Sequence, residues 1–317
     1  MVRPTPVIID TDPGVDDALA LLLAAASPEL EVLAVTTVGG NVSLDQATEN
    51  ARRIVPLAWG SRPHPPIHRG EACCLETAEY VHGQDGLGGV TFSGASRRER
   101  YPAAAPVADT PAFEVISSLV RAHPVPVTLV TLGPLTNAAA AFRRDPEGMR
   151  RVREVVIMGG TFRETGNTTP VAEFNVFADP ESAQALCGSG LPLRWVPLDV
   201  TQQCLLRPAH LEALPDSSRA AFIREIARFY MDYHHRGHGE HACYLHDPTA
   251  VAAVIWPELF RTVPMRVDVE TTGTLTRGMT IADFRHTANR STTPPNSRIA
   301  LEVDHEELLR RIVPRLA

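Results

Sequence analysis

Lysine is absent from this chain of 317 residues, and all 30 of its basic residues are arginines. The absence excludes mechanisms that depend on a lysine side chain, such as a P-loop lysine, a Schiff-base amine or a serine–lysine dyad. Acidic residues outnumber basic ones, which gives a net charge of −7 and a pI near 5.9. This balance offers no electrostatic attraction to nucleic acid or to an acidic membrane, so we expect neither as a partner.

Cysteine is scarce, and long apolar runs are absent. The five cysteines are odd in number and show no CxxC spacing: Cys73, Cys74, Cys187, Cys204 and Cys243. They favour a reducing compartment over a disulfide framework. No apolar run approaches the length of a transmembrane helix, and strand-like sequence begins by Pro6, which leaves no room for a signal peptide. We therefore expect a cytoplasmic protein.

The most informative stretch is VIIDTDPGVDD, residues 7–17. Three β-branched apolar residues precede four carboxylates, Asp10, Asp12, Asp16 and Asp17, with Pro-Gly between the pairs. The pattern predicts a buried strand that ends in a tight turn, from which a helix departs. Four like charges repel one another, so we expect a hard divalent cation with oxygen ligands to offset them. The alternative, that acids simply favour the first turn of a helix, explains only Asp16 and Asp17.

Strands alternate with helices along most of the chain. Further strands are predicted at Glu31–Val38, Val125–Leu132, Glu154–Met158 and Leu193–Leu198. Ser43 and Gln46 form a capping box that opens a helix through about Val55. This order predicts an α/β fold: a single domain over residues 1–317 with a mainly parallel, doubly wound, Rossmann-like sheet and helices on both faces. Ligands bind such sheets at the carboxyl ends of the strands.

Polar residues cluster at those predicted strand ends and in long loops. They are Asp10, Asp12, Asp16, Asp17, Asn41, Asn167, Glu173, Asn175, His246 and Asp247. Any single asparagine here is a turn former, but the shared placement favours a site. His246 precedes Asp247-Pro248 at a predicted helix start, where a histidine beside a carboxylate can act as a general acid. An N-capping Asp247 with an incidental histidine is an equal alternative.

Two other stretches contain histidine. Residues 80–94 are rich in glycine and contain His82, so we expect a mobile loop near a site. Five histidines and a cysteine crowd into residues 234–246: His234, His235, His238, His241, Cys243 and His246. A zinc site is conceivable, but the irregular spacing and the glycines at 237 and 239 favour a flexible loop that contacts a ligand or nothing.

Taken together, these motifs resemble the inosine-uridine-preferring nucleoside hydrolases, in particular their histidine-bearing group. The resemblance is carried in order from residue 7 to 248 by Asp10–Asp17, Gly40-Asn41, Val81–Gly88, Gly133–Asn137, Met158–Gly160, Gly166-Asn167, Ala172–Asn175 and His246–Pro248. It implies calcium-dependent hydrolysis of the N-glycosidic bond of ribonucleosides to free base and ribose, in purine or pyrimidine salvage. It also implies a homo-oligomer, a tetramer or a dimer.

The resemblance assigns a role to each matching residue. Asp12 would be the base that activates water and, with Asp17, Asp247 and the main-chain carbonyl of Leu132, would bind Ca²⁺. His246 would protonate the leaving base, and His82 would lie near that base. The ribose would be held by Asp16, Asn41, Asn167, Glu173 and Asn175. Asp10 would support the metal site without touching the ion. Base preference stays open: aromatic stacking would suit purines, whereas polar contacts from the histidines, His234 among them, would suit a pyrimidine. Tyr230 and Tyr233 fit the base pocket or the core equally well.

Two other classes of protein remain as alternatives. An Asp-x-Asp motif after a strand also opens the haloacid-dehalogenase-like phosphatases, although Pro13–Asp17 fits that pattern poorly. A non-catalytic calcium- or ribose-binding protein would need neither a base on water nor an acid on the leaving group. Release of free ribose from inosine or uridine distinguishes all three.

Overall fold

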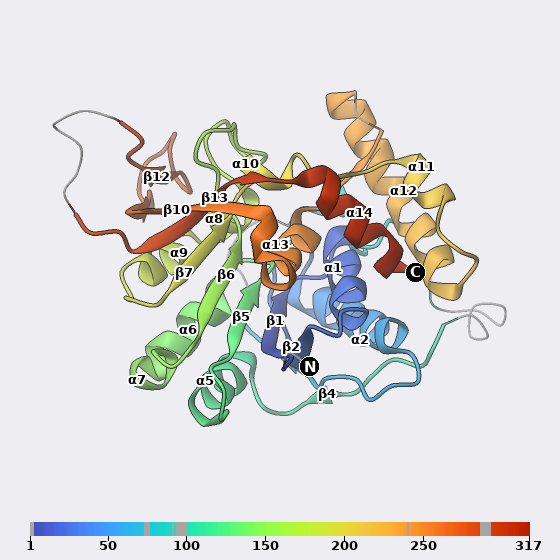
Figure 1. The fold of residues 1–317 in the computed structure, drawn as a ribbon, viewed down its shortest axis with the longest axis horizontal. Helices are drawn as coiled ribbons and strands as arrows, with labels where there is room; N and C mark the ends of the chain where they lie inside the picture. Colours follow the sequence, from blue (N-terminus) through green and yellow to red (C-terminus); the bar gives the residue numbers. More distant parts are fainter. Residues whose placement is uncertain (1–2, 73–76, 91, 93–100, 240, 286–292) are drawn as a thin grey trace.

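A nine-stranded sheet dominates the computed structural model, which describes residues 3–72, 77–90, 92, 101–239, 241–285 and 293–317 (Figure 1). Within these residues the strand order is β10-β13-β7-β6-β5-β1-β2-β3-β4, and every neighbouring pair is parallel except β10 with β13. The strands are β1 (Thr5–Thr11), β2 (Leu30–Thr37), β3 (Ile67–Arg69), β4 (Val107–Ala108), β5 (Thr128–Thr131), β6 (Glu154–Met158), β7 (Leu193–Val196), β10 (Phe260–Met265) and β13 (Ser297–Val303). The predicted α/β class with a mainly parallel sheet is confirmed.

Helices cover both faces of this sheet (Figure 1). They are α1 (Val15–Ala25), α2 (Leu44–Trp59), α3 (Glu79–His82), α5 (Ala112–Ala122), α6 (Thr136–Arg144), α7 (Pro146–Met149), α8 (Phe174–Ala178), α9 (Pro180–Cys187), α10 (Leu198–Thr201), α11 (Pro208–Glu212), α12 (Ser218–His238), α13 (His246–Ile255) and α14 (His305–Leu316), with a 3₁₀ turn at Pro257–Leu259. Two small antiparallel pairs lie apart from the main sheet: β8 (Leu205–Leu206) with β9 (Cys243–Tyr244), and β11 (Val267–Val269) with β12 (Thr280–Ala282).

β1 is apolar on both faces because each face meets a layer of helices. Val7 and Ile9 belong to a core shared with α1, α2, α13 and α14, whereas Ile8 belongs to a second core shared with α5, α6 and α9. All three side chains are fully buried. The unbroken apolar run in the sequence is therefore the signature of a parallel strand covered on both sides.

The parallel strands bring their carboxyl ends to one edge of the sheet. β1 is followed there by Asp12, and its neighbour β5 is followed by Leu132. At the same edge α13 begins with His246 and packs against α1. The opening turn and a segment more than 200 residues later in the chain are thereby brought together.

The helix that starts after Ser43 runs further than the predicted end near Val55. Ser43 accepts a hydrogen bond from the Gln46 N–H, but the Gln46 side chain donates to Asn50, so only half of the predicted capping box forms. α2 continues past Pro56, which has no N–H to offer the carbonyl of Arg52. The N–H of Ala105 bonds that carbonyl instead, at 2.9 Å, so the helix carries its proline without an orphaned acceptor.

The histidine-rich stretch is largely helical. α12 extends through His238 and ends at Gly239, which caps the helix with a φ of +74° that favours glycine. The prediction of a flexible loop from His234 is therefore wrong as far as His238. Among the described residues, no helix is long and apolar enough to cross a membrane. Cys187, Cys204 and Cys243 are buried free thiols, whereas Cys73 and Cys74 lie outside the described residues.

Candidate active site

A cavity of about 320 Å³ opens at the carboxyl edge of the sheet. Most of the residues singled out from the sequence line it: Asp16, Asn41, His82, Leu132, Asn167, Glu173, Asn175, His246 and Asp247. Asp12 and Asp17 are fully buried in the same region and do not line the cavity. Sequence reasoning missed Met158, Gln202 and Tyr244, which also line it.

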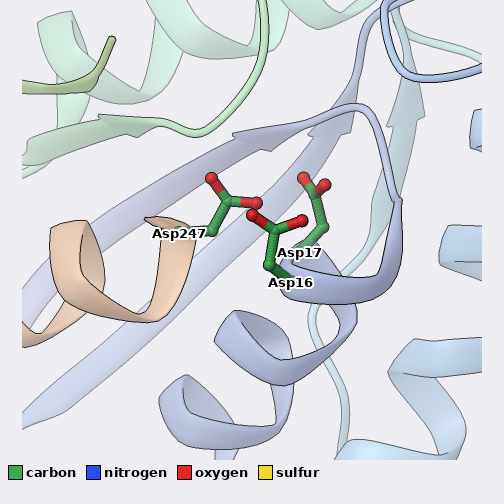
Figure 2. Close-up of side chains that lie close together, drawn as sticks. All are labelled: Asp16, Asp17 and Asp247. Atoms are coloured by element: carbon green, nitrogen blue, oxygen red, sulfur yellow. The ribbon is translucent and has the colours of Figure 1, made fainter. Parts of the chain in front are cut away.

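Three carboxylates converge beside this cavity, and two of them, Asp16 and Asp247, line it. Asp16 and Asp17 come from the first turn of α1, and Asp247 comes from the first turn of α13 (Figure 2). One oxygen from each lies within 4.8 Å of the others. Asp16, which the resemblance assigns to ribose, is thus in the same close group as two predicted metal ligands. Such a group of oxygen donors can hold a metal ion.

Asp12 is held in a cradle of glycines. Its Oδ2 accepts a 2.6 Å hydrogen bond from the Asn41 N–H, while Oδ1 is buried with no hydrogen-bond partner among the described residues. A Cβ atom at Gly40 or Gly133 would collide with this carboxylate. The glycines of the Gly40-Asn41 and Gly133-Pro134 motifs are therefore required by the close approach of their backbones to Asp12.

The electrostatics of these acids call for a cation. Burial and mutual repulsion raise the pKa values of Asp12, Asp16 and Asp247 well above the ordinary aspartate value. Among the described residues no arginine forms a salt bridge with any of them, and Nδ1 of His82 lies 3.9 Å from Oδ1 of Asp16. The oxygen atoms Oδ1 of Asp12 and Oδ1 of Asp16 are both buried without hydrogen bonds. A hard divalent ion fits this donor set, since it supplies the missing positive charge.

Asp17 is better satisfied than its neighbours, whereas Asp10 keeps one oxygen, Oδ2, buried without a hydrogen-bond partner among the described residues. Asp17 accepts hydrogen bonds from the Thr11 hydroxyl, from the Gly14 N–H at 2.9 Å and from Nδ2 of Asn41 at 3.0 Å. Asp10 accepts from Thr36 at 2.5 Å and from Asn137 at 2.8 Å, and burial raises its pKa to about 7. Asp10 lies outside the close carboxylate group. Its hydrogen bonds hold the end of β1 against its neighbours.

The loop between β6 and α8, residues 159–173, forms another wall of the cavity. Glu173 ends this loop and accepts the N–H groups of Gly160, Asn175 and Val176 at 2.9, 2.9 and 3.1 Å. Burial nevertheless raises the pKa of Glu173. Asn167 is exposed at the mouth of the cavity, where its Oδ1 accepts the N–H of Phe174 at 2.9 Å.

Asn175 ties this loop to the carboxyl ends of two strands. Its Nδ2 donates to the carbonyl of Leu132 at 2.6 Å and to the carbonyl of Met158 at 3.2 Å. The Leu132 carbonyl, which the resemblance proposes as a metal ligand, therefore points into the site. Asn175 holds β5 and β6 at a fixed separation at this edge of the sheet.

His82 is anchored to the opening turn. It ends α3, it is 5% exposed, and its Nδ1 accepts the Val15 N–H at 3.2 Å. Its ring stacks on Tyr230, with 5.2 Å between centroids. Burial lowers the pKa of His82 to about 3, so the ring is neutral and its proton sits on Nε2. Residues 91, 93 and 94 of the predicted mobile loop lie outside the described residues.

His246 has two neighbours that sequence reasoning did not find. Its Nδ1 lies 2.8 Å from the hydroxyl of Thr201, and its ring stacks on Tyr244, with 5.5 Å between centroids and an 11° interplanar angle. Burial and the nearby histidines His234 and His82 lower the pKa of His246 to about 3. The ring is therefore a neutral imidazole that faces the cavity.

Aromatic side chains form part of the cavity lining. His234 lies edge-on to Tyr230 and Tyr244, with centroid distances of 4.5 and 4.7 Å. Tyr230 is 2% exposed, yet it lines the cavity together with Tyr233. Tyr230 therefore belongs both to the core and to the pocket. Within the part of the chain that the structure describes, the metal-capable groups of histidines, cysteines and acids comprise only the three aspartates, so the zinc alternative finds no support.

Comparisons with known proteins agree on one family. Residues 7–310 match the family described as inosine-uridine preferring nucleoside hydrolase. The chain is 38% identical to the inosine-uridine preferring nucleoside hydrolase of Leishmania major, over 96% of this chain and 95% of that protein. It is 39% identical to the pyrimidine-specific ribonucleoside hydrolase RihA of Enterobacter sp. strain 638, over 98% and 97%. A solved purine-preferring ribonucleoside hydrolase from Gardnerella vaginalis superposes with a TM-score of 0.88 at 30% identity, over 98% of both chains.

Proposed function

Because the chain belongs to the inosine-uridine-preferring nucleoside hydrolase family, we propose that it hydrolyses the N-glycosidic bond of ribonucleosides to free base and ribose. The observation that carries this proposal is the close group of Asp16, Asp17 and Asp247, with Asp12 near enough to share their repulsion, beside a cavity of about 320 Å³. The relatives are named as hydrolases of nucleosides rather than as phosphatases or binding proteins, so neither alternative is retained.

Asp12, Asp17, Asp247 and the Leu132 carbonyl would hold a calcium ion. The donor set consists of oxygen atoms only, which suits Ca²⁺ better than zinc. The unpartnered Oδ1 of Asp12 and the carboxylate group of Figure 2 support the assignment. When bound, calcium offsets the repulsion among the acids, lowers the pKa of water and orients ribose hydroxyls.

Asp12 acts as the general base in this proposal. Its Oδ2 is held by the Asn41 N–H, which leaves Oδ1 to take the proton as water attacks the anomeric carbon. The bond between sugar and base breaks through an oxocarbenium-like transition state, which carries positive charge on the ribose ring. The carboxylates beside the cavity stabilise that charge because they are already in place before the reaction.

The ribose is bound between the opening turn and the β6–α8 loop. Asp16 and Asn41 hold its hydroxyls from one side, while Asn167, Glu173 and Asn175 hold its hydroxyls and its 5′ end from the other. All five residues line the cavity. Glu173 and Asn175 are positioned by backbone groups, which keeps their side chains in place for the sugar.

His246 and His82 serve the leaving base. Negative charge develops on the heterocycle as the bond breaks, so its ring nitrogen becomes more basic. The Nε2–H of the neutral His246 ring donates a hydrogen bond to that nitrogen, and the negative charge that develops there favours a protonated ring, which passes its proton to the base and returns to neutral imidazole. His82 also lines the cavity and offers a second N–H, at Nε2, since its Nδ1 already accepts the Val15 N–H.

Incubation with inosine and with uridine, followed by an assay for reducing ribose, tests the proposal. We expect stoichiometric ribose and free base from at least one of the two. A phosphate ester serves as the comparison substrate. Hydrolysis of that ester without ribose release from any nucleoside would refute the proposed function.

A further inference from the structure

The Thr201 hydroxyl is directed at His246 across a long interval of sequence. Thr201 is fully buried at the end of α10, and the 2.8 Å contact between its Oγ1 and Nδ1 of His246 joins residues 45 positions apart. Among the described residues this hydroxyl has no other hydrogen-bond partner. The contact therefore has to be explained by the histidine and not by local structure.

Other buried threonines in helices of this chain behave differently. The hydroxyls of Thr48 and Thr249 donate to carbonyls four residues earlier, Leu44 at 2.7 Å and Leu245 at 2.6 Å. That back-bonding is the ordinary choice for a helical threonine. Thr201 has the equivalent carbonyl of Pro197 within its own turn, because the Thr201 N–H bonds it at 3.1 Å, yet the hydroxyl turns to His246 instead.

The two neighbours of His246 restrain different motions of the ring. Stacking on Tyr244 limits the tilt of the ring but leaves it free to turn within its own plane. A hydrogen bond at Nδ1 removes that second freedom. A hydroxyl can donate to Nδ1 when the ring proton is on Nε2, so it stabilises the tautomer whose N–H is available to the cavity.

We propose that Thr201 is a positioning residue for His246, and that its hydroxyl holds Nδ1 so that the Nε2–H is presented to the leaving base. The inference rests on the proposed function and deepens it. Thr201 touches no substrate in this arrangement and acts only through the histidine. Its effect should therefore appear with substrates whose leaving group needs a proton, and only with them.

The test compares two substrates in three variants. Thr201→Val keeps the shape of the side chain and removes the hydroxyl, whereas Thr201→Ser keeps the hydroxyl. For Thr201→Val we expect kcat/KM on inosine or uridine to fall about tenfold, mainly in kcat, and kcat/KM on 4-nitrophenyl riboside to stay within about twofold. Thr201→Ser should stay within about threefold on both substrates. Thr249→Val, which removes a buried hydroxyl three residues from His246 without touching its ring, should leave the ratio between substrates unchanged.

A double variant isolates the coupling between the two residues. Thr201→Val added to His246→Ala should cause no further loss on the natural nucleosides, because the hydroxyl then has no ring to hold. Equal losses on both substrates, failure of Thr201→Ser to restore activity, or additive effects in the double variant would each overturn the inference. If the unmodified chain released ribose from no nucleoside, the proposed function would fall and this inference with it. An active chain indifferent to Thr201→Val would refute the inference alone.

Discussion

The two carboxylate oxygens of Asp12 have different surroundings. Oδ2 accepts the Asn41 N–H beside Gly40, and Oδ1, beside Gly133, is buried without a hydrogen-bond partner among the described residues. A buried carboxylate oxygen with no hydrogen bond is costly, so its persistence indicates a partner that arrives with the ligands. Water and a cation are the partners that the proposed reaction supplies.

Replacement of Asp12 by asparagine should abolish turnover with little effect on the fold. The amide oxygen can still accept the Asn41 N–H, but the amide cannot take a proton from water. We expect kcat to fall about a thousandfold, in the range for loss of a general base. Thermal unfolding should stay within a few degrees, because the change removes a charge that its neighbours repel. Turnover at the normal rate would remove Asp12 as the base.

Replacement of His246 by alanine should separate two kinds of leaving group. Natural bases leave poorly as anions, so kcat on inosine or uridine should fall by about two to three orders of magnitude, the usual contribution of a general acid. Nitrophenolate needs no proton, so 4-nitrophenyl riboside should be hydrolysed within about fivefold of the normal rate. Similar losses on both substrates would show that His246 positions the sugar instead.

Helix α10 anchors the β6–α8 loop through hydrogen bonds to the backbone of the loop. The buried carboxylate of Asp199 accepts the N–H groups of Phe162 and Arg163, each at 2.9 Å. The same short helix carries Thr201, which contacts His246. One element of four residues thus anchors the loop that carries Asn167 and Glu173 and also contacts the proposed acid.

Asp199→Asn tests the anchoring of this loop. The amide has one acceptor oxygen, so one of the two N–H groups loses its partner, at a cost of about 1–3 kcal/mol. We expect KM for nucleosides to rise about fivefold while kcat stays within about threefold, since only the placement of the ribose contacts is disturbed. Asp145→Asn, which alters a helix cap that does not line the cavity, is the control and should leave KM unchanged. An unaltered KM in Asp199→Asn would contradict the anchoring role.

Some of these elements could be predicted from the sequence, and others could not. The Asp-x-Asp turn and His246-Asp247-Pro248 are visible because each sits where a regular pattern ends, and patterns of period 2 and 3.6 locate such ends. Thr201 and Asp199 interrupt no pattern, and their partners lie 36 to 45 residues away. Contacts between positions so far apart depend on how α10 packs against α13 and against the β6–α8 loop, and no local spacing encodes that packing.

Helix lengths show a similar limit. Pro56 predicts the end of a helix, yet α2 continues because Ala105, from a distant segment, bonds the carbonyl that the proline cannot reach. The overall sheet was predictable for the opposite reason. Its central strands β1, β5, β6 and β7 are buried on both faces, so each is recognisable as an apolar run without any knowledge of its neighbours.

Contacts between the first and last thirds of the chain hold the fold together. Asp16 and Asp17 on α1 meet Asp247 on α13, and α14 packs into the same core as α1 and α2 (Figure 1). A cation bound by both helices would join these parts of the chain. We therefore propose that residues 1–317 unfold as one cooperative domain whose stability depends on the ion.

Removal of the metal should lower the stability of the entire molecule, because the acids then face one another without a counter-charge. At a calcium concentration a hundredfold above its dissociation constant, binding to the folded chain alone contributes about 2.7 kcal/mol. That corresponds to a rise in Tm of about 5 °C. Scanning calorimetry with a chelator, with Ca²⁺ and with Mg²⁺ measures this shift, and we expect a single transition that calcium moves upward. Asp247→Asn is the control, and its Tm should no longer respond to calcium. A calcium-insensitive Tm in the unmodified chain would contradict the metal site, and two separate transitions would contradict the single domain.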